Sequence, residues 1–212
     1  FLDGYAYRLH YFSDWIRDNE QMGFVKECTS ETLCAQPQEL WLNFMTTHVD
    51  SYQPMKKDPS LVEVMAAQEK KWQGTVVSYI PKEKLNLPPE ELKIKDGDIL
   101  AMVTNIKGLD IVHVGFAFWK DNHLHLLHAS SSAKKVIEDP KTQYESSGKT
   151  KAHIGVRAIL WNIEFEFATY WHQLNTFCPT FNHLVKAESN RLAAIYATVK
   201  YCTINQCAMI VY

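Results

Sequence analysis

Residues 111–130 restrict the fold more than any other part of the chain, because they have the pattern of two strands joined by a tight turn. Apolar and aromatic side chains recur near period two in "IVHVGFAFW" (111–119) and "HLHLLHAS" (123–130), and the turn signal "KDN" (120–122) lies between them. Asp and Asn are common in turns because they tolerate the left-handed backbone conformation. The segment therefore predicts a β-hairpin, and with it an antiparallel sheet in the middle of the chain.

Two histidines of this hairpin, His113 and His128, are predicted to lie on one face of the sheet. If Asp121-Asn122 is the whole loop, His128 falls opposite Gly115, which shares the face of His113. The two rings are then diagonal neighbours, with Cβ atoms roughly 7 Å apart. A three-residue loop would instead place them on opposite faces. The loop length therefore decides whether the histidines can act together.

The small residues of the first strand are a second feature of this face. Strand parity puts Ile111, Gly115 and Ala117 beside His113. A glycine and an alanine next to a histidine predict the close approach of another backbone, usually that of a helix. Most single histidines in strands are hydrogen-bonded parts of the structure. A structural and a catalytic interpretation of the pair therefore both stay open.

The rest of the chain predicts a single α+β domain over residues 1–212, with a central antiparallel sheet and helices from both ends of the chain. Residues 1–74 and 162–212 have mainly helical apolar spacing, and residues 75–161 have mainly period-two spacing. The predicted strands are 75–80, 98–105, 111–119, 123–130, 133–139 and 152–161, with a short strand at 207–212. The predicted helices are 10–24, 38–48, 58–74, 163–177 and 178–201.

Composition excludes several functional classes. The chain has 212 residues, 46% of them hydrophobic, and a net charge of −2, which gives no electrostatic argument for binding nucleic acid or an anionic membrane. No apolar run reaches the ~18 residues that a membrane span needs. The opening "FLDGYAYRLH" lacks the basic and apolar regions of a signal peptide. We therefore expect a mature or trimmed form of the protein.

The cysteines supply one candidate nucleophile. The chain has five cysteines, an odd number, and no C-x-x-C pair, which argues against a disulfide framework. Cys178 precedes Pro179, which suits the first position of a helix, so the thiol would lie at a helix N-terminus that stabilises a thiolate. A small buried hydrophobe is the structural alternative for Cys178. That structural interpretation is favoured for the other four, which are Cys28, Cys34, Cys202 and Cys207.

A metal centre is the other chemistry that the histidines suggest. The run "HLHLLH" (123–128) contains H-x-H-x-x-H, which superficially resembles a zinc motif. Strand parity puts His123 and His125 on the face opposite His128, so one ion would not easily take all three. No acidic ligand follows within the motif, and no second His or Cys pair has zinc-ligand spacing. We therefore predict no metal.

A family resemblance rests on four segments, "DGYAYRLHYFSDWIRDN", "IPKEKL", "DGDILAMVTNIKGLDIVHVGFAFWK" and "LHLLHASSSAKKV". They closely resemble bacterial envelope proteins of the N-acetylmuramoyl-L-alanine amidase-like family, in the NlpC-type branch of papain-like cysteine hydrolases. The resemblance is dense over residues 3–157. It implies a papain-like fold, in which a cysteine at a helix start faces an antiparallel sheet that carries the histidines. It also implies that the substrate is peptidoglycan, cut at an amide in or next to its peptide stem.

The resemblance also implies roles for individual residues. The general base of the family's "HVG" motif falls on His113, and the polar residue that orients it falls on His128. In the family the cysteine precedes the segment that opens this chain. Here the similar stretch is "FCPTF", which makes Cys178 the candidate nucleophile. The order His–His–Cys is that of circularly permuted relatives, and a permutation would require residues 1 and 212 to lie close together.

The expected ligand is peptidoglycan or a muropeptide fragment, without a cofactor, and the expected location is the cell envelope or periplasm. Among the expected substrate contacts, the Asp14 carboxylate suits a free stem-peptide amine. Two alternatives stay open. One is a non-catalytic envelope-binding or scaffold protein whose nucleophile is missing, and the other is a His-ligated metal hydrolase. The sequence predicts no oligomeric state. The expected substrate contacts are Tyr11, Asp14, Trp15, Ser130 and Ser131.

Overall fold

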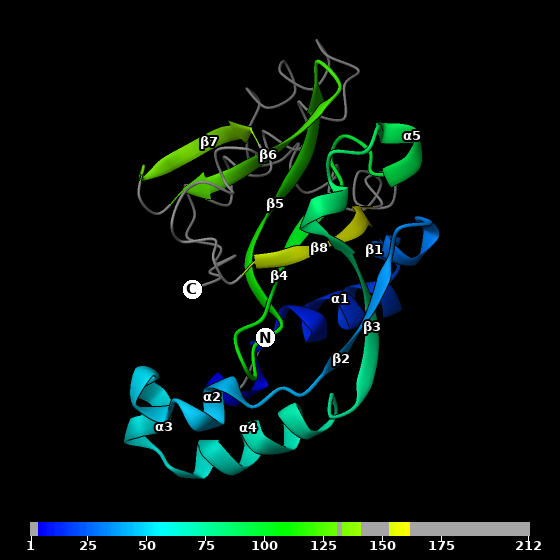
Figure 1. Cartoon of the computed structure of the whole chain (residues 1–212). Helices are drawn as coiled ribbons and strands as arrows, with labels where there is room; N and C mark the ends of the chain where they lie inside the picture. The colour runs from blue at the N-terminus through cyan, green and yellow to red at the C-terminus, as the bar shows by residue number, and fades with distance from the viewer. Residues whose placement is uncertain (1–3, 131–132, 141–152, 162–212) are drawn as a thin grey trace.

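The computed structural model describes residues 4–130, 133–140 and 153–161, and its centre is one antiparallel sheet of eight strands (Figure 1). The strand order is β2-β3-β8-β4-β5-β6-β7, and β1 also pairs with β8. This confirms the predicted α+β class with a central antiparallel sheet. The strands are β1 (Val25–Glu27), β2 (Gln36–Leu40), β3 (Thr75–Pro81), β4 (Ile99–Thr104), β5 (Ile111–Lys120), β6 (His123–Ser130), β7 (Lys135–Pro140) and β8 (His153–Trp161).

Within the described residues, one α-helix precedes β1, three lie between β2 and β3, and one lies between β3 and β4. Two of them, α1 and α4, confirm helices predicted within 10–24 and 58–74. The helices predicted at 163–177 and 178–201, and the strand predicted at 207–212, lie outside the described residues. No helix in the described ranges is long and apolar enough to cross a membrane. The helices are α1 (Phe12–Gln21), α2 (Phe44–Thr47), α3 (Gln53–Lys57), α4 (Ser60–Lys70) and α5 (Pro89–Leu92).

The helix predicted over 38–48 is wrong for most of its length. Residues Gln36–Leu40 form β2 and pair antiparallel with β3, and helix returns only in α2. β2 ends the strand order, so Pro37 is accommodated in a strand with a neighbour on one side only. Pairing with β3 also buries Leu40. Tertiary pairing here outweighs the helical propensity of the local sequence.

The β5–β6 hairpin has the predicted two-residue loop. Asp121 and Asn122 have φ angles of 51° and 60°, as a type I′ turn requires. The strands pair from Lys120 with His123 through Phe116 with Leu127. This register is the one predicted from the sequence. In this register, even-numbered residues of β6 lie on the same sheet face as odd-numbered residues of β5.

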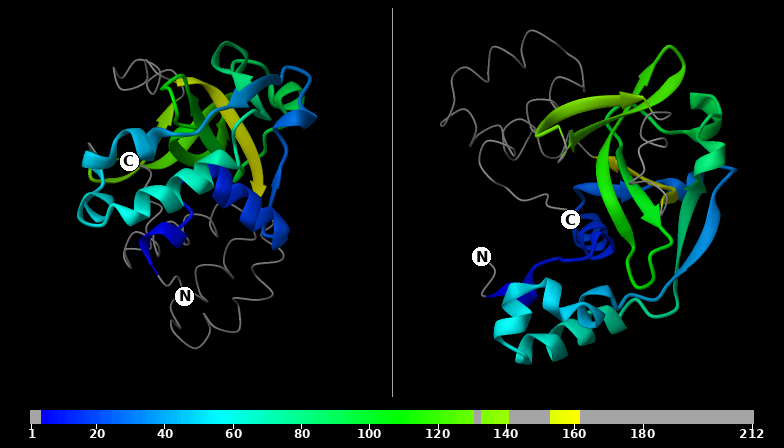
Figure 2. Two further views of the ribbon diagram at one scale, coloured as in Figure 1. Left: turned by 90° about the horizontal axis from the view of Figure 1, so that it is seen from below. Right: turned by 60° about the vertical axis from the view of Figure 1, so that its left-hand side comes forward.

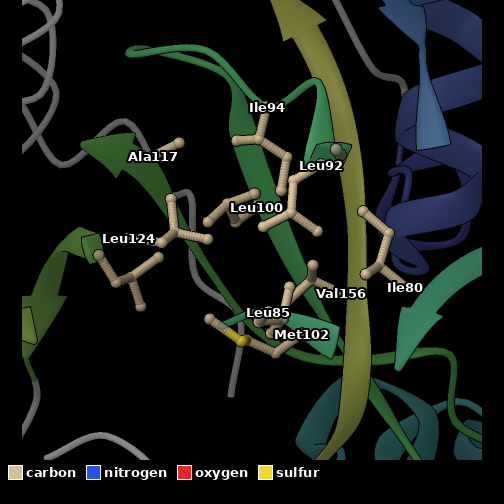
Figure 3. Packing of buried hydrophobic residues seen from close by; sticks show 11 residues of the cluster. Ile80, Leu85, Leu92, Ile94, Leu100, Met102, Ala117, Leu124 and Val156 are labelled. Carbon is tan, nitrogen blue, oxygen red and sulfur yellow. The ribbon is translucent and has the colours of Figure 1, made fainter. Parts of the chain in front are cut away.

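The central strands of the sheet are buried on both faces, and one apolar cluster lies on each face. The first, here called the histidine face, is covered by apolar residues of the segment between β3 and β4, among them Leu85, Leu92 and Ile94 (Figure 3). The second, here called the α1 face, is covered by Ile16 of α1. The histidine face contains Leu100, Met102, Leu124, Leu126, Val156 and Ala158. The α1 face contains Ile99, Ala101, Val103, Phe116 and Ile159.

A third apolar cluster joins α2, α3 and α4, which group together at one end of the sheet (Figure 2). Met55 and Met65 are fully buried in it. The Glu69 carboxylate is also buried there and accepts hydrogen bonds from the Tyr11 hydroxyl at 2.6 Å and from the Thr46 hydroxyl at 2.5 Å. A buried carboxylate needs such donors, so this cluster binds the chain before α1 firmly to α4.

A buried polar network fixes α1 against the sheet. Arg157 on β8 donates to Glu27 Oε2 at 2.5 and 2.8 Å, and to the Ser13 hydroxyl at 3.0 Å. The Ser13 backbone N–H in turn donates to Asp110 Oδ2 at 2.8 Å. Asp110 therefore caps the start of α1 from a distant loop. Burial raises the pKa of the Asp110 carboxyl above its ordinary value.

Candidate active site

His113 and His128 are in direct contact on the histidine face. His113 Nε2 lies 2.8 Å from His128 Nδ1, and the two rings are nearly perpendicular, with an angle of 89° and centroids 4.8 Å apart. His113 comes from β5 and pairs with Met102 of β4, and His128 comes from β6. The predicted diagonal pair is therefore formed. His128 is buried and His113 is half-buried.

A β-bulge beside His113 changes the predicted strand parity. The β4–β5 register shifts between the pairs Met102–His113 and Val103–Ile111, which leaves Val112 as the extra residue. Ile111 consequently packs on the α1 face, and Val112 packs against the histidine-face cluster. The prediction that Ile111 shares the face of His113 is wrong for this reason. The bulge leaves His113 itself on the face of Met102.

The close approach predicted at Gly115 is made by a neighbouring strand. A Cβ atom at Gly115 would lie 2.6 Å from Leu126 Cδ1 and 2.9 Å from the Leu127 carbonyl oxygen, both on β6. Among the described residues, the nearest atoms at this position are therefore not those of a helix, in contrast to the prediction. Gly115 lets the Leu126 side chain fill the space between the paired strands. The hairpin that carries both histidines is tightly packed as a result.

Asp139 is a member of the site that sequence reasoning missed. Its Oδ2 lies 3.0 Å from His128 Nε2, so His113, His128 and Asp139 form one continuous hydrogen-bonded chain across β5, β6 and β7. Asp139 pairs with Leu126, one diagonal step from His128. The one sequence feature that could have indicated this role is that Asp139 is an acidic residue at the end of the predicted strand 133–139. Its use required the β6–β7 register, which the local sequence pattern does not fix.

The site favours an uncharged His113. The pKa of His113 is lowered to about 4, first by burial and second by the nearby His128 ring. At neutral pH this imidazole is therefore neutral and has a lone pair on one nitrogen. A neutral ring is the form that can accept a proton.

The residues predicted on α1 as substrate contacts are not brought to the histidines. Tyr11 is 2% exposed, and its hydroxyl donates a hydrogen bond to the Glu69 carboxylate. Trp15 packs on the α1 face, opposite the histidines. Asp14 accepts a hydrogen bond of 2.7 Å from Trp72 Nε1. These contacts hold α1 in place, and helical spacing alone could not indicate which sheet face α1 would cover.

Ser130 does lie on the histidine face, two positions beyond His128 on β6. Its side chain is buried, and Ser130 Oγ accepts a hydrogen bond of 3.2 Å from the Ala133 backbone N–H. This bond joins the end of β6 to Ala133, which lies two positions before β7. The prediction for Ser131 falls outside the described residues.

Two cysteines lie within the described ranges, and both are packed as parts of the structure. Cys28 and Cys34 are free and partly buried, and both pack against the histidine-face cluster. Cys28 Sγ donates to the Ala158 carbonyl oxygen at 3.1 Å. Burial, with a smaller contribution from Asp98, raises the pKa of the Cys28 thiol to about 12. Cys28 is therefore a protonated small hydrophobe at neutral pH. Cys178 lies outside the described residues.

The three histidines of the H-x-H-x-x-H run do not converge. His125 Nδ1 lies 3.0 Å from Glu138 Oε1 on the face opposite His128, and His123 is exposed at the start of β6. Within the described ranges, no group of three or more His, Cys, Asp or Glu side chains is placed to hold a metal ion. Strand alternation therefore explains the run: His125 contacts Glu138 on one face, and His128 contacts Asp139 on the other.

Comparisons with solved structures find close neighbours. An N-acetylmuramoyl-L-alanine amidase from Bacteroides uniformis is 37% identical with a TM-score of 0.68, and the match covers 76% of this chain and 67% of that one. A Bacteroides fragilis protein provisionally named a xylanase is 39% identical with a TM-score of 0.68, over 76% of this chain and 69% of that one. A Legionella pneumophila protein, at 23% identity and a TM-score of 0.51, covers 74% of this chain and 63% of its own length and shares the fold alone.

The family match covers most of the same region. Residues 2–151 match the N-acetylmuramoyl-L-alanine amidase-like family, which confirms the resemblance seen in the sequence. No functionally curated protein matches the chain. The chain spans 66–69% of the length of its Bacteroides neighbours. Since the family match covers more than half of the chain and includes both site histidines, the chain belongs to the N-acetylmuramoyl-L-alanine amidase-like family.

Proposed function

We propose that this chain is a cysteine-dependent hydrolase that cuts an amide bond in or next to the peptide stem of peptidoglycan. The observation that carries the proposal is the 2.8 Å contact between His113 Nε2 and His128 Nδ1 on a buried sheet face. The family match and the amidase name of the Bacteroides uniformis neighbour support peptidoglycan as the substrate class. The cell envelope or periplasm is the proposed location, because peptidoglycan is a polymer of the envelope.

The proposed nucleophile is Cys178, which the sequence predicts to lie at the start of a helix beside Pro179. In the proposed reaction His113 takes the thiol proton, and the thiolate attacks the amide carbon. His113 then returns the proton to the leaving amine, and a water molecule, activated by the same ring, hydrolyses the thioester. His128 orients His113, and the backbone N–H of Cys178 is the proposed oxyanion donor.

The proposed arrangement is papain-like and NlpC-type, with residues 1–212 as one domain. Support comes from the antiparallel sheet that carries His113 and His128 on adjacent strands. The order His–His–Cys corresponds to a circular permutation of that arrangement. It would have the Cys178 helix pack over the histidine face.

Glycoside hydrolysis, suggested by the name of the Bacteroides fragilis neighbour, fits this site less well. Glycosidases of the usual kind place two carboxyl groups on either side of the scissile bond. The hydrogen-bonded chain here contains two imidazoles and one carboxylate, Asp139. Two imidazoles in contact can accept and return a proton during acyl transfer, but they do not supply the pair of carboxyl groups that a glycosidase uses.

Digestion of purified peptidoglycan by the whole chain tests the proposal. We expect soluble products with new amine and carboxyl ends at a stem-peptide amide, identified by mass spectrometry, and the same yield in the presence of a chelator. New reducing sugar ends would favour a glycosidase, and loss of activity with the chelator would favour a metal hydrolase. Binding to peptidoglycan without any product would favour the non-catalytic alternative.

A further inference from the structure

The carboxylate at the end of the histidine chain raises the question of which ring carries charge. A histidine that only orients the base would stabilise an imidazolium less well than a carboxylate does. In this site the carboxylate is present, but it contacts His128 at 3.0 Å and not His113. We propose that Asp139 is a positioning residue that fixes the tautomers of both rings and lets His128 carry the positive charge of the proton-transfer step. This inference rests on the proposed function, since it concerns the same base.

The hydrogen bonds fix the tautomers by elimination. An ionised Asp139 can only accept, so His128 Nε2 carries the hydrogen of their 3.0 Å bond. The Nδ1 of a neutral His128 then has the lone pair and accepts from His113 Nε2–H at 2.8 Å. In a neutral His113 this leaves the lone pair on Nδ1. The proton-accepting atom of the site is therefore His113 Nδ1.

The same chain allows the charge to leave His113 as it forms. When His113 Nδ1 takes the proton of the nucleophile, its Nε2–H proton can pass to His128 Nδ1. His113 is then neutral again, with its hydrogen on Nδ1, and His128 is an imidazolium with hydrogens on both nitrogens. One proton enters at Nδ1 and one leaves at Nε2, so the proton count balances. Return of the proton to the leaving amine reverses both transfers.

The position of the Asp139 carboxylate favours His128 as the ring that carries the charge. Burial disfavours the charged form of His113 and lowers its pKa. His128 is 6% exposed, but its imidazolium would contact the Asp139 carboxylate directly. Lys135, opposite Ser130 in the β6–β7 register, also belongs to this face and is exposed. The neighbouring charged groups on the other face are Lys120, His125 and Glu138.

Nitrogen-15 NMR of the histidine rings in the whole chain tests the proposal without any assay of activity. We expect hydrogens on Nε2 of both rings at neutral pH. In Asp139→Asn we expect part of the His128 rings to carry the hydrogen on Nδ1 instead, because an amide side chain can donate as well as accept. A hydrogen on His128 Nδ1 in the neutral wild-type ring, or an unchanged tautomer pattern in Asp139→Asn, would overturn the proposal.

Kinetics supply a second readout and a matched control. We expect Asp139→Asn to lower kcat roughly 10- to 100-fold with little change in KM, less than the ~10⁴-fold loss when a carboxylate bonded directly to the base is removed from a Ser-His-Asp triad. Asp139→Glu should recover part of the loss. Glu138→Gln removes a carboxylate from the adjacent position on β7 and should leave kcat unchanged. Equal losses in Asp139→Asn and Glu138→Gln, or matching losses of thermal stability, would indicate a structural role. A wild-type chain without hydrolytic activity would contradict the proposed function and leave the NMR result to decide the relay.

Discussion

Replacing His113 with Ala is expected to reduce the release of stem peptides from peptidoglycan roughly 10³-fold, which is within the range for loss of a general base. The ring of His113 is half-buried, is neutral at pH 7 with its pKa lowered to about 4, and contacts His128 at 2.8 Å. In the proposed mechanism, its loss removes the group that accepts the proton of the nucleophile. Because that interaction develops in the transition state, kcat and kcat/KM should fall together. Mass spectrometry of the soluble products measures the effect.

His123→Ala is the matched control for this variant. His123 is on the same hairpin, but it is exposed and lies on the opposite sheet face. We expect its activity to equal that of the wild type. A His113→Ala chain that folds normally and retains wild-type activity would exclude His113 as the base. Equal losses in both variants would indicate damage to the hairpin.

Replacing Arg157 with Met is expected to lower the free energy of unfolding by about 3 kcal/mol. Arg157 is 5% exposed and its guanidinium donates to Glu27 and to Ser13, so the substitution leaves the Glu27 carboxylate without its cation. The figure is at the low end for a broken buried ion pair, because the Glu27 side chain is 20% exposed and can reach water. Urea denaturation of the whole chain, followed by tryptophan fluorescence, measures the change.

Lys26→Met is the corresponding surface control. Lys26 also pairs with a glutamate, Glu31 at 2.5 Å, but the side chains are 64% and 48% exposed. Exposed ion pairs contribute little to stability, so we expect no measurable change. If Arg157→Met destabilised the chain no more than Lys26→Met, the buried network would not be what holds α1 to the sheet.

The hairpin was predictable because one local feature determines its geometry. A two-residue loop at Asp121-Asn122 fixes the register, and the register in turn brings His113 and His128 to one face. The wrong face for Ile111 arose from a β-bulge, which depends on pairing with β4 and not on the local pattern.

Other features were not predictable because distant pairing decides them. The strand β2 has polar residues and Pro37 and no alternating pattern, so only its pairing with β3 makes it a strand. Asp139 reaches His128 only through the β6–β7 register. The substrate contacts expected on α1 depended on the sheet face that α1 covers, which helical spacing leaves open.

The rate of thiol alkylation tests the central claim most directly, because that claim couples a cysteine to the His113–His128 pair. The whole chain is treated with iodoacetamide at neutral pH, and each of the five cysteines is followed by peptide mass spectrometry. We predict that Cys178 reacts faster than the other cysteines, and that His113→Ala removes this difference. Labelling of Cys178 no faster than that of the others, or labelling that is unchanged in His113→Ala, would contradict the assignment of this cysteine and histidine as a working pair.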